Sequence, residues 1–250
     1  MDFVSTCLTP QMQNIHTGAA GKCCSCSVLW RNNMLSVIFD MDGVIFDTEM
    51  LCRKAWHSME EEYGISTEKM DQLLILCVGT NRAHMVKTFL EQLGNRFPVE
   101  RFLDESMERI AALGASGLPL KKGAVELLSW LKKQNALLAL ASSTKRSLVI
   151  QELTDAGLLD YFSVITGGDQ VTKSKPDPEI YLKTCQALGI SPETAFGIED
   201  SYNGVRSASA AGLKTIMVPD LLPPTDEMRS LALCIQPDLL AVKDYFHRNK

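Results

Sequence analysis

Two acidic residues, Asp40 and Asp42, directly follow the apolar run of residues 36–39 and could do chemistry together. Side chains two positions apart on an extended chain point to the same side, so both carboxylates would face one site. Gly43 would then let the chain turn sharply away from the strand. Acidic residues that follow a strand can also serve only as turn formers or helix caps. This pair alone leaves both interpretations open, and the choice between them depends on the rest of the chain.

Further polar groups follow three later apolar runs. They are Ser142, Lys175 and the pair Glu199-Asp200. Several carboxylates packed together repel one another, so a cation must hold them, and oxygen ligands favour Mg2+. Lys175 adds a second positive charge, and Ser142 offers a hydroxyl group. Together these groups would form a receptor for a phosphoryl group beside a carboxylate nucleophile.

Short strand-like runs alternate with amphipathic helical patterns over most of the chain. The predicted strands are residues 36–39, 136–140, 162–166, 195–198 and 215–218, with a weaker one at 231–235. The predicted helices between them are residues 123–134, 145–157, 178–189 and 201–212. This alternation predicts an α/β fold, a doubly wound (Rossmann-like) parallel sheet with helices on both faces. The polar groups would then meet at the carboxyl edge of the sheet, where such folds bind ligands.

Residues 48–118 break the alternation, because they contain helical patterns and no convincing strand. The clearest patterns are residues 54–63, 82–93 and 105–113. The segment is too long for one crossover between parallel strands. We therefore expect an inserted α-helical cap domain at 48–118, and a core domain formed by 34–47 and 119–250. The two connections would lie near residues 46–49 and 116–121.

Residues 1–33 carry few charges and show no hydrophobic periodicity, which predicts a disordered N-terminal arm. The segment has neither the apolar stretch of a secretory signal nor the Arg-rich pattern of a mitochondrial presequence. Its Cys-Cys-Ser-Cys cluster lacks the second ligand pair that a structural zinc site needs. Met34 stands immediately before the first strand-like run. Our hypothesis is that Met34 is the functional start and that the preceding segment is dispensable.

The composition fits an ordinary globular protein and excludes several classes. The chain has 250 residues, of which 46% are hydrophobic and 22% charged. A net charge of −5 with scattered basic residues argues against nucleic acid as a partner. Apolar runs such as residues 136–141 are far shorter than the ~20 residues that span a bilayer. The four dispersed cysteines are expected to be buried thiols, which favours a cytoplasmic protein. We also expect a monomer with a small-molecule partner.

Four separated motifs resemble, in order and approximate spacing, those of the haloacid dehalogenase superfamily. They are Asp40-Met41-Asp42-Gly43-Val44, Ser142, Lys175 and Glu199-Asp200. The predicted helical insert resembles the cap of the subfamily that contains β-phosphoglucomutase, phosphoglycolate phosphatase and sugar-phosphate phosphatases. The resemblance covers residues 34 to about 220. It implies a Mg2+-dependent phosphatase that acts on a small phosphorylated metabolite, with a sugar phosphate as the first candidate.

The resemblance also implies a role for each motif residue. Asp40 would attack phosphorus and form an aspartyl phosphate. Asp42 would protonate the leaving oxygen and then activate water, and its backbone carbonyl would bind the metal. Ser142 would donate to the phosphoryl oxygens, and Lys175 would balance their charge. The expected metal ligands are Asp40, Asp42, Glu199 and Asp200.

Substrate-binding residues are expected in the cap and after the second strand. Arg82 lies between cap helices at a position where related proteins contact the substrate, although it could be a simple surface charge. Glu49 begins the first cap helix. Ser143 and Lys145 are further candidates, but Ser143 and Thr144 could instead cap the next helix, and Lys145 could be solvated.

Two alternatives to a phosphatase stay open. A β-phosphoglucomutase-type phosphomutase is the first, but Cys52 stands where that pattern has a histidine, which favours hydrolysis. The second is a non-catalytic module that binds a phosphorylated metabolite, although both Asp40 and Lys175 are retained. Dehalogenase chemistry needs no Mg2+ and so does not require the Glu199-Asp200 pair, which makes it a weaker interpretation than a phosphatase.

Overall fold

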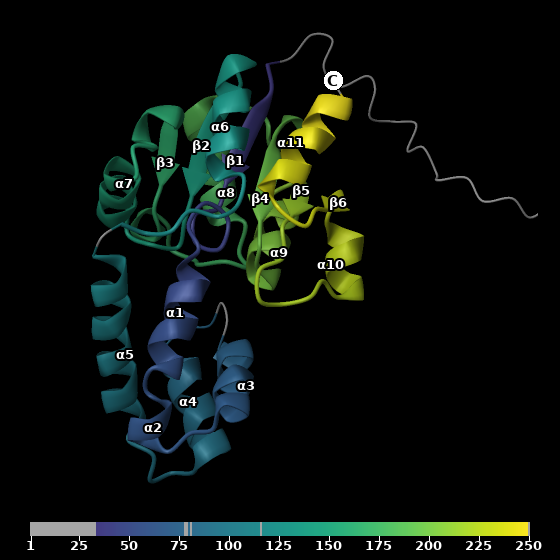
Figure 1. The fold of residues 1–250 in the computed structure, drawn as a ribbon. Coiled ribbons are helices and arrows are strands. Elements are labelled where there is room, and N and C mark those ends of the chain that lie inside the picture. Colours follow the sequence, from purple (N-terminus) through teal and green to yellow (C-terminus); the bar gives the residue numbers. More distant parts are fainter. Residues whose placement is uncertain (1–33, 78–79, 81, 116, 250) are drawn as a thin grey trace, which may run out of the picture.

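The core of the protein is a six-stranded parallel sheet with the order β3-β2-β1-β4-β5-β6 (Figure 1). The computed structural model describes residues 34–77, 80, 82–115 and 117–249, so the predictions for residues 1–33 lie outside it. The strands are β1 (Ser36–Phe39), β2 (Leu137–Ala141), β3 (Val164–Thr166), β4 (Phe196–Glu199), β5 (Lys214–Met217) and β6 (Cys234–Ile235). Every neighbouring pair is parallel. The predicted doubly wound α/β fold is confirmed.

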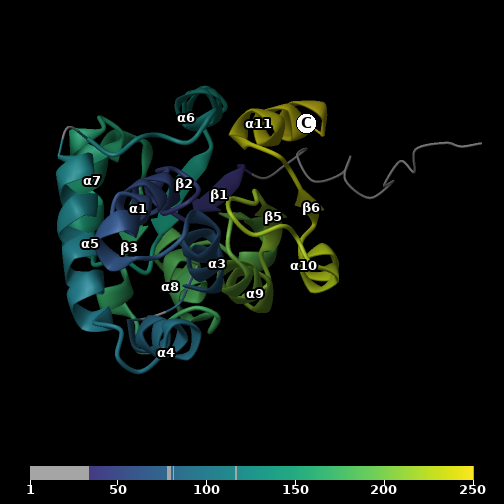
Figure 2. The ribbon, with the colours of Figure 1, turned by 60° about the horizontal axis from the view of Figure 1, so that its bottom comes forward.

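Helices cover both faces of this sheet. They are α6 (Ala124–Lys133), α7 (Arg146–Asp155), α8 (Glu179–Leu188), α9 (Tyr202–Ala210), α10 (Asp226–Leu231) and α11 (Leu239–Arg248). Short 3-10 turns occupy Leu159–Tyr161, Gly168–Gln170 and Pro192–Thr194. Figure 2 shows α6 and α11 on one face of the sheet, with α8 and α9 on the other. The helices that flank β2, α6 and α7, thus lie on one face, and those that flank β4, α8 and α9, lie on the other. Helices on both faces were predicted from the sequence pattern.

Strand β1 lies in the middle of the sheet, and its side chains are apolar on both faces. Val37 and Phe39 belong to the hydrophobic cluster that includes residues of α6 and α11, whereas Ile38 belongs to the opposite cluster with residues of α8. This division follows from the two-residue period of a strand, which sends successive side chains to opposite faces. A strand buried on both faces is a rigid support for the residues that follow it.

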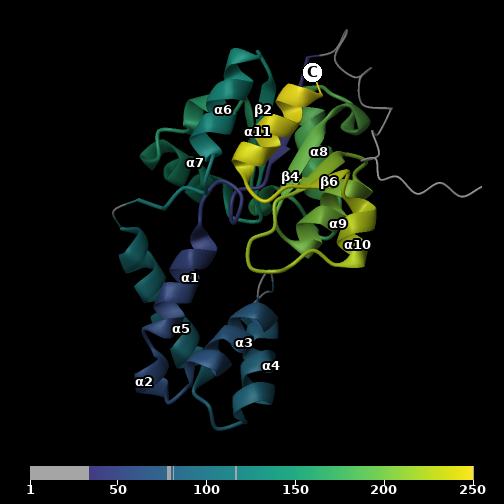
Figure 3. The same ribbon diagram turned by 45° about the vertical axis from the view of Figure 1, so that its right-hand side comes forward.

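A separate helical bundle lies next to the carboxyl edge of the sheet (Figures 1 and 3). Its helices are α1 (Thr48–His57), α2 (Glu60–Tyr63), α3 (Thr67–Cys77), α4 (Arg82–Leu93) and α5 (Val99–Gly114). These helices bury a hydrophobic cluster of their own. At its centre the rings of Trp56, Tyr63 and Phe89 lie 5.0–5.4 Å from that of Phe102, centroid to centroid. This separate core supports our interpretation of residues 48–118 as a cap.

The helical bundle differs in detail from the sequence prediction. Helix α1 begins at Thr48, one residue before Glu49, because the Asp47 carboxylate accepts a hydrogen bond from the amide of Met50 at 3.4 Å and caps the helix. The expected helix at 54–63 is divided, since α1 ends at His57 and α2 begins at Glu60. Helix α3 lies within the segment predicted to be helical, although it was not given a range of its own.

The C-terminal region also departs from expectation. The weak strand predicted at 231–235 is only Cys234–Ile235, because residues up to Leu231 belong to α10. The Thr225 hydroxyl accepts a hydrogen bond from the amide of Met228 at 3.3 Å and starts that helix. Helix α11 completes one face of the sheet and was also missing from the prediction.

The two connections between sheet and bundle run side by side. The amide of Asp47 donates to the carbonyl of Pro119 at 2.7 Å, and the amide of Lys121 donates to that of Ile45 at 2.9 Å. Phe46 and Leu120 form an antiparallel bridge between these bonds. The chain therefore leaves the sheet and returns to it at one place.

No helix among the described residues is long and apolar enough to cross a membrane. Cys52, Cys77 and Cys185 are free thiols in the described part of the chain. Cys77 and Cys185 are buried as expected, whereas Cys52 and Cys234 are half-buried.

The helical bundle should depend on its aromatic centre. Replacing Phe102, which is fully buried, with alanine should lower the free energy of unfolding by about 3–5 kcal/mol, because it removes a ring from a packed core. Met107→Ala is the matched control, because Met107 lies in the same helix and is 60% exposed. Urea denaturation followed by circular dichroism measures both variants. Equal losses for the two variants would contradict a packed core centred on Phe102.

Candidate active site

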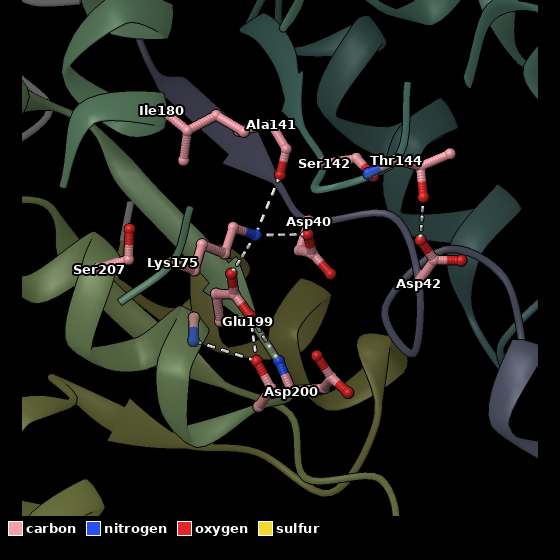
Figure 4. Close-up of polar contacts among 12 residues, drawn as sticks. Asp40, Asp42, Ala141, Ser142, Thr144, Lys175, Ile180, Glu199, Asp200 and Ser207 are labelled. Atoms are coloured by element: carbon pink, nitrogen blue, oxygen red, sulfur yellow. Dashed lines mark hydrogen bonds and ion pairs between the residues drawn. The ribbon is translucent and has the colours of Figure 1, made fainter. Parts of the chain in front are cut away.

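Asp40 lies immediately beyond the carboxyl end of β1, in the middle of the sheet edge (Figure 4). Its amide donates to the carbonyl of Ile198 in β4 at 2.9 Å, which extends the strand pairing to this residue. Its side chain is buried and accepts a hydrogen bond from Lys175 at 2.6 Å. The backbone of the central strands therefore fixes the position of this carboxylate.

The ammonium group of Lys175 joins three strands. Nζ donates to Asp40 Oδ1 at 2.6 Å, to Glu199 Oε1 at 2.7 Å and to the carbonyl of Ala141 at 3.1 Å, which uses all three of its protons. Burial alone lowers the pKa of Lys175, but the two carboxylates outweigh it and hold the pKa above its usual range. Lys175 is therefore a permanent positive charge inside the site.

The loop that carries Lys175 is fastened by Glu179 in the first turn of α8. The Glu179 carboxylate accepts hydrogen bonds from the amides of Thr172 and Lys173, each at 2.9 Å, and from the Thr172 hydroxyl at 2.8 Å. These bonds lower the pKa of Glu179, so it stays ionised. The lysine thus reaches the site from a loop whose backbone is held by its own neighbour.

Asp40, Glu199 and Asp200 form a buried acidic cluster that could hold a metal ion. One carboxylate oxygen from each lies within 4.8 Å of the others. Burial raises the pKa of Asp40 to about 7, where the Glu199 charge adds to it and Lys175 opposes it. Burial, followed by the charges of Glu199 and Asp40, also raises the pKa of Asp200. A hard divalent cation would relieve this repulsion, and an all-oxygen donor set fits Mg2+.

Two glycines allow the backbone to approach the acidic cluster. A Cβ at Gly43, where φ is +76°, would lie 2.2 Å from Asp200 Oδ2. A Cβ at Gly204 would lie 1.9 Å from Glu199 Oε2. Both positions exclude any side chain, so the loop after β1 and the start of α9 close directly on the carboxylates.

The side chain of Asp42 lies apart from the acidic cluster, on the side of β2 (Figure 4). Its Oδ2 accepts a hydrogen bond from the Thr144 hydroxyl at 3.0 Å. Burial raises its pKa, and the hydrogen bonds from Thr144 and Thr48 oppose this increase. Metal binding through its backbone carbonyl stays a prediction.

Ser142 is fully buried after β2, and its hydroxyl accepts the amide of Thr144 at 3.0 Å. The alternative of Ser143 or Thr144 as the cap of α7 was wrong, because Lys145 occupies that position and makes no side-chain cap bond. The Thr144 hydroxyl is committed to Asp42 instead. Ser143 and Lys145 are exposed, and their binding of substrate stays a prediction.

The two cap candidates have different surroundings. Glu49 lies in the first turn of α1, beside the connections to the sheet. Burial raises its pKa to about 7, and the charges of Asp220 and Asp42 add to the effect. Arg82 instead donates to Glu100 at 2.6 Å and to Asp104 at 2.7 Å, both in α5. The role of Arg82 in substrate binding stays a prediction.

Sequence reasoning missed Tyr181, whose hydroxyl donates to Glu199 Oε1 at 2.5 Å. Tyr181 is fully buried in α8, and the Lys175 ammonium lies 5.1 Å from the centre of its ring. In the sequence this residue is one more apolar position of an amphipathic helix. No local pattern marks it, because a buried phenol needs a polar partner and this partner, Glu199, is 18 residues away in the sequence.

A family model for haloacid dehalogenase-like hydrolases matches residues 37–218, which include all of these side chains. The chain belongs to this family. It is 35% identical over 184 residues to a phosphorylated carbohydrates phosphatase of Thermotoga maritima, covering 73% of this chain and 84% of the relative. It is 29% identical over 187 residues to hexitol phosphatase B of Escherichia coli K12, covering 74% of this chain and 84% of that protein.

A solved structure agrees with this assignment. The hydrolase is similar to the crystal structure of a putative β-phosphoglucomutase from Thermotoga maritima, with a TM-score of 0.70 and 30% identity. The match covers 86% of this chain and 99% of that one, so it includes both the sheet and the helical bundle. The resemblance seen in the sequence motifs is confirmed.

Gly43 provides a test of the close approach to Asp200. Gly43→Ala and Gly64→Ala both place a side chain at positive φ, which costs about 1 kcal/mol each. A Cβ at Gly64 meets nothing within 4 Å, whereas one at Gly43 overlaps the Asp200 carboxylate. Gly43→Ala should therefore lower the melting temperature more than Gly64→Ala in thermal denaturation. Equal shifts would show that the loop over Asp200 can move away freely.

Proposed function

We propose that this protein is a Mg2+-dependent phosphatase that hydrolyses a small phosphorylated sugar or polyol through an aspartyl phosphate on Asp40. The observation that carries the proposal is the position of Asp40 between a fixed ammonium group and two further buried carboxylates. The family assignment and the names of the two curated relatives support it.

The residues that would hold Mg2+ are Asp40, Glu199 and Asp200, with the backbone carbonyl of Asp42 as a fourth ligand. A bound Mg2+ would screen the anionic substrate from the nucleophile and polarise the phosphoryl oxygens. The acidic cluster is crowded enough to need a cation, and Lys175 alone supplies one positive charge against three carboxylates.

In the first step a carboxylate oxygen of Asp40 forms a bond to phosphorus while the bond to the leaving oxygen breaks. Lys175 fixes the orientation of this carboxylate and stabilises the charge on the transferring group. Asp42 gives its proton to the leaving oxygen, and its raised pKa keeps part of it protonated for that purpose. The Thr144 hydroxyl holds the Asp42 carboxyl in place.

In the second step water attacks the phosphorus of the aspartyl phosphate. Asp42, now ionised, takes a proton from that water, and the bond between phosphorus and Asp40 breaks. The products are inorganic phosphate and free Asp40. Ser142 would donate its hydroxyl to a phosphoryl oxygen in both steps, because its oxygen already accepts the Thr144 amide.

Hydrolysis is favoured over phosphoryl return by the surroundings of α1. Cys52 stands where the mutase pattern has a histidine, and burial raises the pKa of its thiol to about 12. A thiol that stays neutral cannot replace a basic imidazole near the leaving group. With β-glucose 1-phosphate, a phosphatase releases free phosphate and a mutase releases glucose 6-phosphate, so the products distinguish the two.

Asp40→Asn tests the nucleophile. The amide cannot form an acyl phosphate at this position, so the release of phosphate from p-nitrophenyl phosphate with Mg2+ should fall at least about a thousandfold. Asp160→Asn is the control, because Asp160 is exposed and precedes β3, at the end of that strand opposite to the site. If the wild-type protein and Asp40→Asn release phosphate at the same low rate, the protein is a binding module and no phosphatase.

Asp200→Asn tests the metal site. Replacing one of the clustered carboxylates with an amide should raise the Mg2+ concentration for half-maximal activity by about tenfold or more. Removal of divalent ions with a chelator should abolish wild-type activity, and added Mg2+ should restore it. The measurement is a Mg2+ titration of p-nitrophenyl phosphate hydrolysis. Activity that persists in the chelator would rule out a metal-dependent mechanism.

A further inference from the structure

Three carboxylates lie where helix α1 meets the sheet: one caps α1, one is in its first turn and one follows β5. They are Asp47, Glu49 and Asp220, and we call them the acidic wall. Lys121 binds two of them, with Nζ at 2.8 Å from Asp220 Oδ1 and 3.7 Å from Asp47 Oδ1. These ion pairs are largely sheltered, because the side chains of Lys121 and Asp220 are only 19% and 15% exposed. The acidic wall is therefore a built feature and no chance group of surface charges.

The fold places the acidic wall beside the proposed phosphoryl site. Asp220 follows β5, the neighbour of β4, whose end carries Glu199 and Asp200. Glu49 follows the loop that begins at Asp40 and is the second residue of α1. Asp220 and Asp200 thus follow the carboxyl ends of two adjacent strands, the edge at which parallel α/β sheets bind ligands.

One oxygen of the acidic wall lacks a partner. Asp220 Oδ1 is paired with Lys121, but Oδ2 is buried and accepts no hydrogen bond from the described residues. A buried carboxylate oxygen without a donor costs free energy, which a ligand donor that reached Asp220 Oδ2 would recover. A hydroxyl group of the substrate is such a donor.

The charges of the acidic wall reach the reacting groups. After burial, the charges that raise the pKa of Glu49 most are those of Asp220 and Asp42, and Lys121 opposes them. Glu49 and Asp220 both raise the pKa of Asp200. A ligand bound at Asp200 therefore lies within the field of both carboxylates.

The acidic wall has few cations to balance it among the described residues. Lys121 is already shared between two carboxylates, and Arg82 is paired with Glu100 and Asp104. Lys145 follows β2, which lies across β1 from β4 and β5. The region around Asp220 and Glu49 therefore carries more negative than positive charge among the described residues.

We propose that Glu49 and Asp220 bind the hydroxyl groups of the leaving alcohol and repel a second anionic group on it. The substrate is then the monophosphate of a neutral polyhydroxyl compound, and bisphosphates and phosphorylated acids are poor substrates. This proposal rests on the phosphatase activity proposed above and adds the basis of its selectivity. Like charges brought together in a sheltered site are strongly unfavourable, which makes the discrimination large.

Two open-chain compounds isolate the charge. Glucitol 6-phosphate and 6-phosphogluconate differ only at carbon 1, which is a CH2OH group in the first and a carboxylate in the second. The wild-type protein should hydrolyse glucitol 6-phosphate with a kcat/KM at least about tenfold higher. A ratio near one, or a preference for 6-phosphogluconate, would overturn the proposal.

Variants of the acidic wall should change the ratio of kcat/KM for glucitol 6-phosphate to kcat/KM for 6-phosphogluconate. Asp220→Asn keeps the shape of the side chain, removes one charge and frees Lys121, so the ratio should fall severalfold. Glu49→Gln should reduce it in the same direction. Glu227→Gln is the control, because Glu227 is exposed and pairs with Arg206 in α9, and its ratio should equal that of the wild type. The ratio is measured within each variant, so a general loss of activity does not affect it. An unchanged ratio in both wall variants would overturn the proposal.

A binding experiment separates this proposal from the phosphatase activity. Asp40→Asn protein with Mg2+ is titrated with each compound by calorimetry, which needs no turnover. Glucitol 6-phosphate should bind at least about tenfold tighter, and Asp220→Asn in the same background should narrow the difference. Equal dissociation constants would overturn the selectivity proposal even if the wild-type protein is an active phosphatase. Tighter binding of glucitol 6-phosphate would support it even if no phosphate is released.

Discussion

The ammonium group of Lys175 is the interaction on which the site depends. It holds Asp40 and Glu199, which follow two different strands, and it also binds the carbonyl at the end of a third. Without a buried cation, three carboxylates within 4.8 Å of one another would repel and would be protonated or displaced. Breaking a buried ion pair costs far more than the pair contributes, because one charge is left uncompensated. The arrangement of strands β1, β2 and β4 therefore brings the carboxylates together. The positive charge of Lys175 offsets part of the repulsion between them.

The surroundings of Glu199 show how completely the protein satisfies this buried carboxylate. Its Oε1 accepts from Lys175 and Tyr181, and its Oε2 accepts from the amide of Asp200 at 3.2 Å and the hydroxyl of Ser201 at 3.4 Å. Asp42, by contrast, accepts a hydrogen bond from the Thr144 hydroxyl, and burial raises its pKa. Two carboxylates with different hydrogen-bond partners thus lie at one edge of the sheet.

The sequence was sufficient for the residues whose position follows from local rules. Asp40, Ser142 and Glu199 stand at or beyond the ends of apolar runs, and parallel strands must bring such positions to one edge. The same reasoning could not find Tyr181 or Asp220, because each is recognised only by its contact with a residue that is distant in the sequence. Thr144 shows a third case, since its spacing fits a helix cap but its hydroxyl is engaged by Asp42, 102 residues away. Local patterns predict which backbone positions meet, whereas the competition between side chains for partners is settled only in the folded protein.

The adjacent connections at Asp47 and Lys121 have an architectural consequence. Because the chain leaves and re-enters the sheet through hydrogen-bonded neighbours, the inserted helices place no demand on the register of β1 and β2. The insert can change in length, sequence or helix number while the strands keep their alignment, since both of its ends meet at one point. The carboxyl edge of the sheet and the helical bundle can therefore evolve at different rates. The inserted helices can change while the side chains at the sheet edge stay the same.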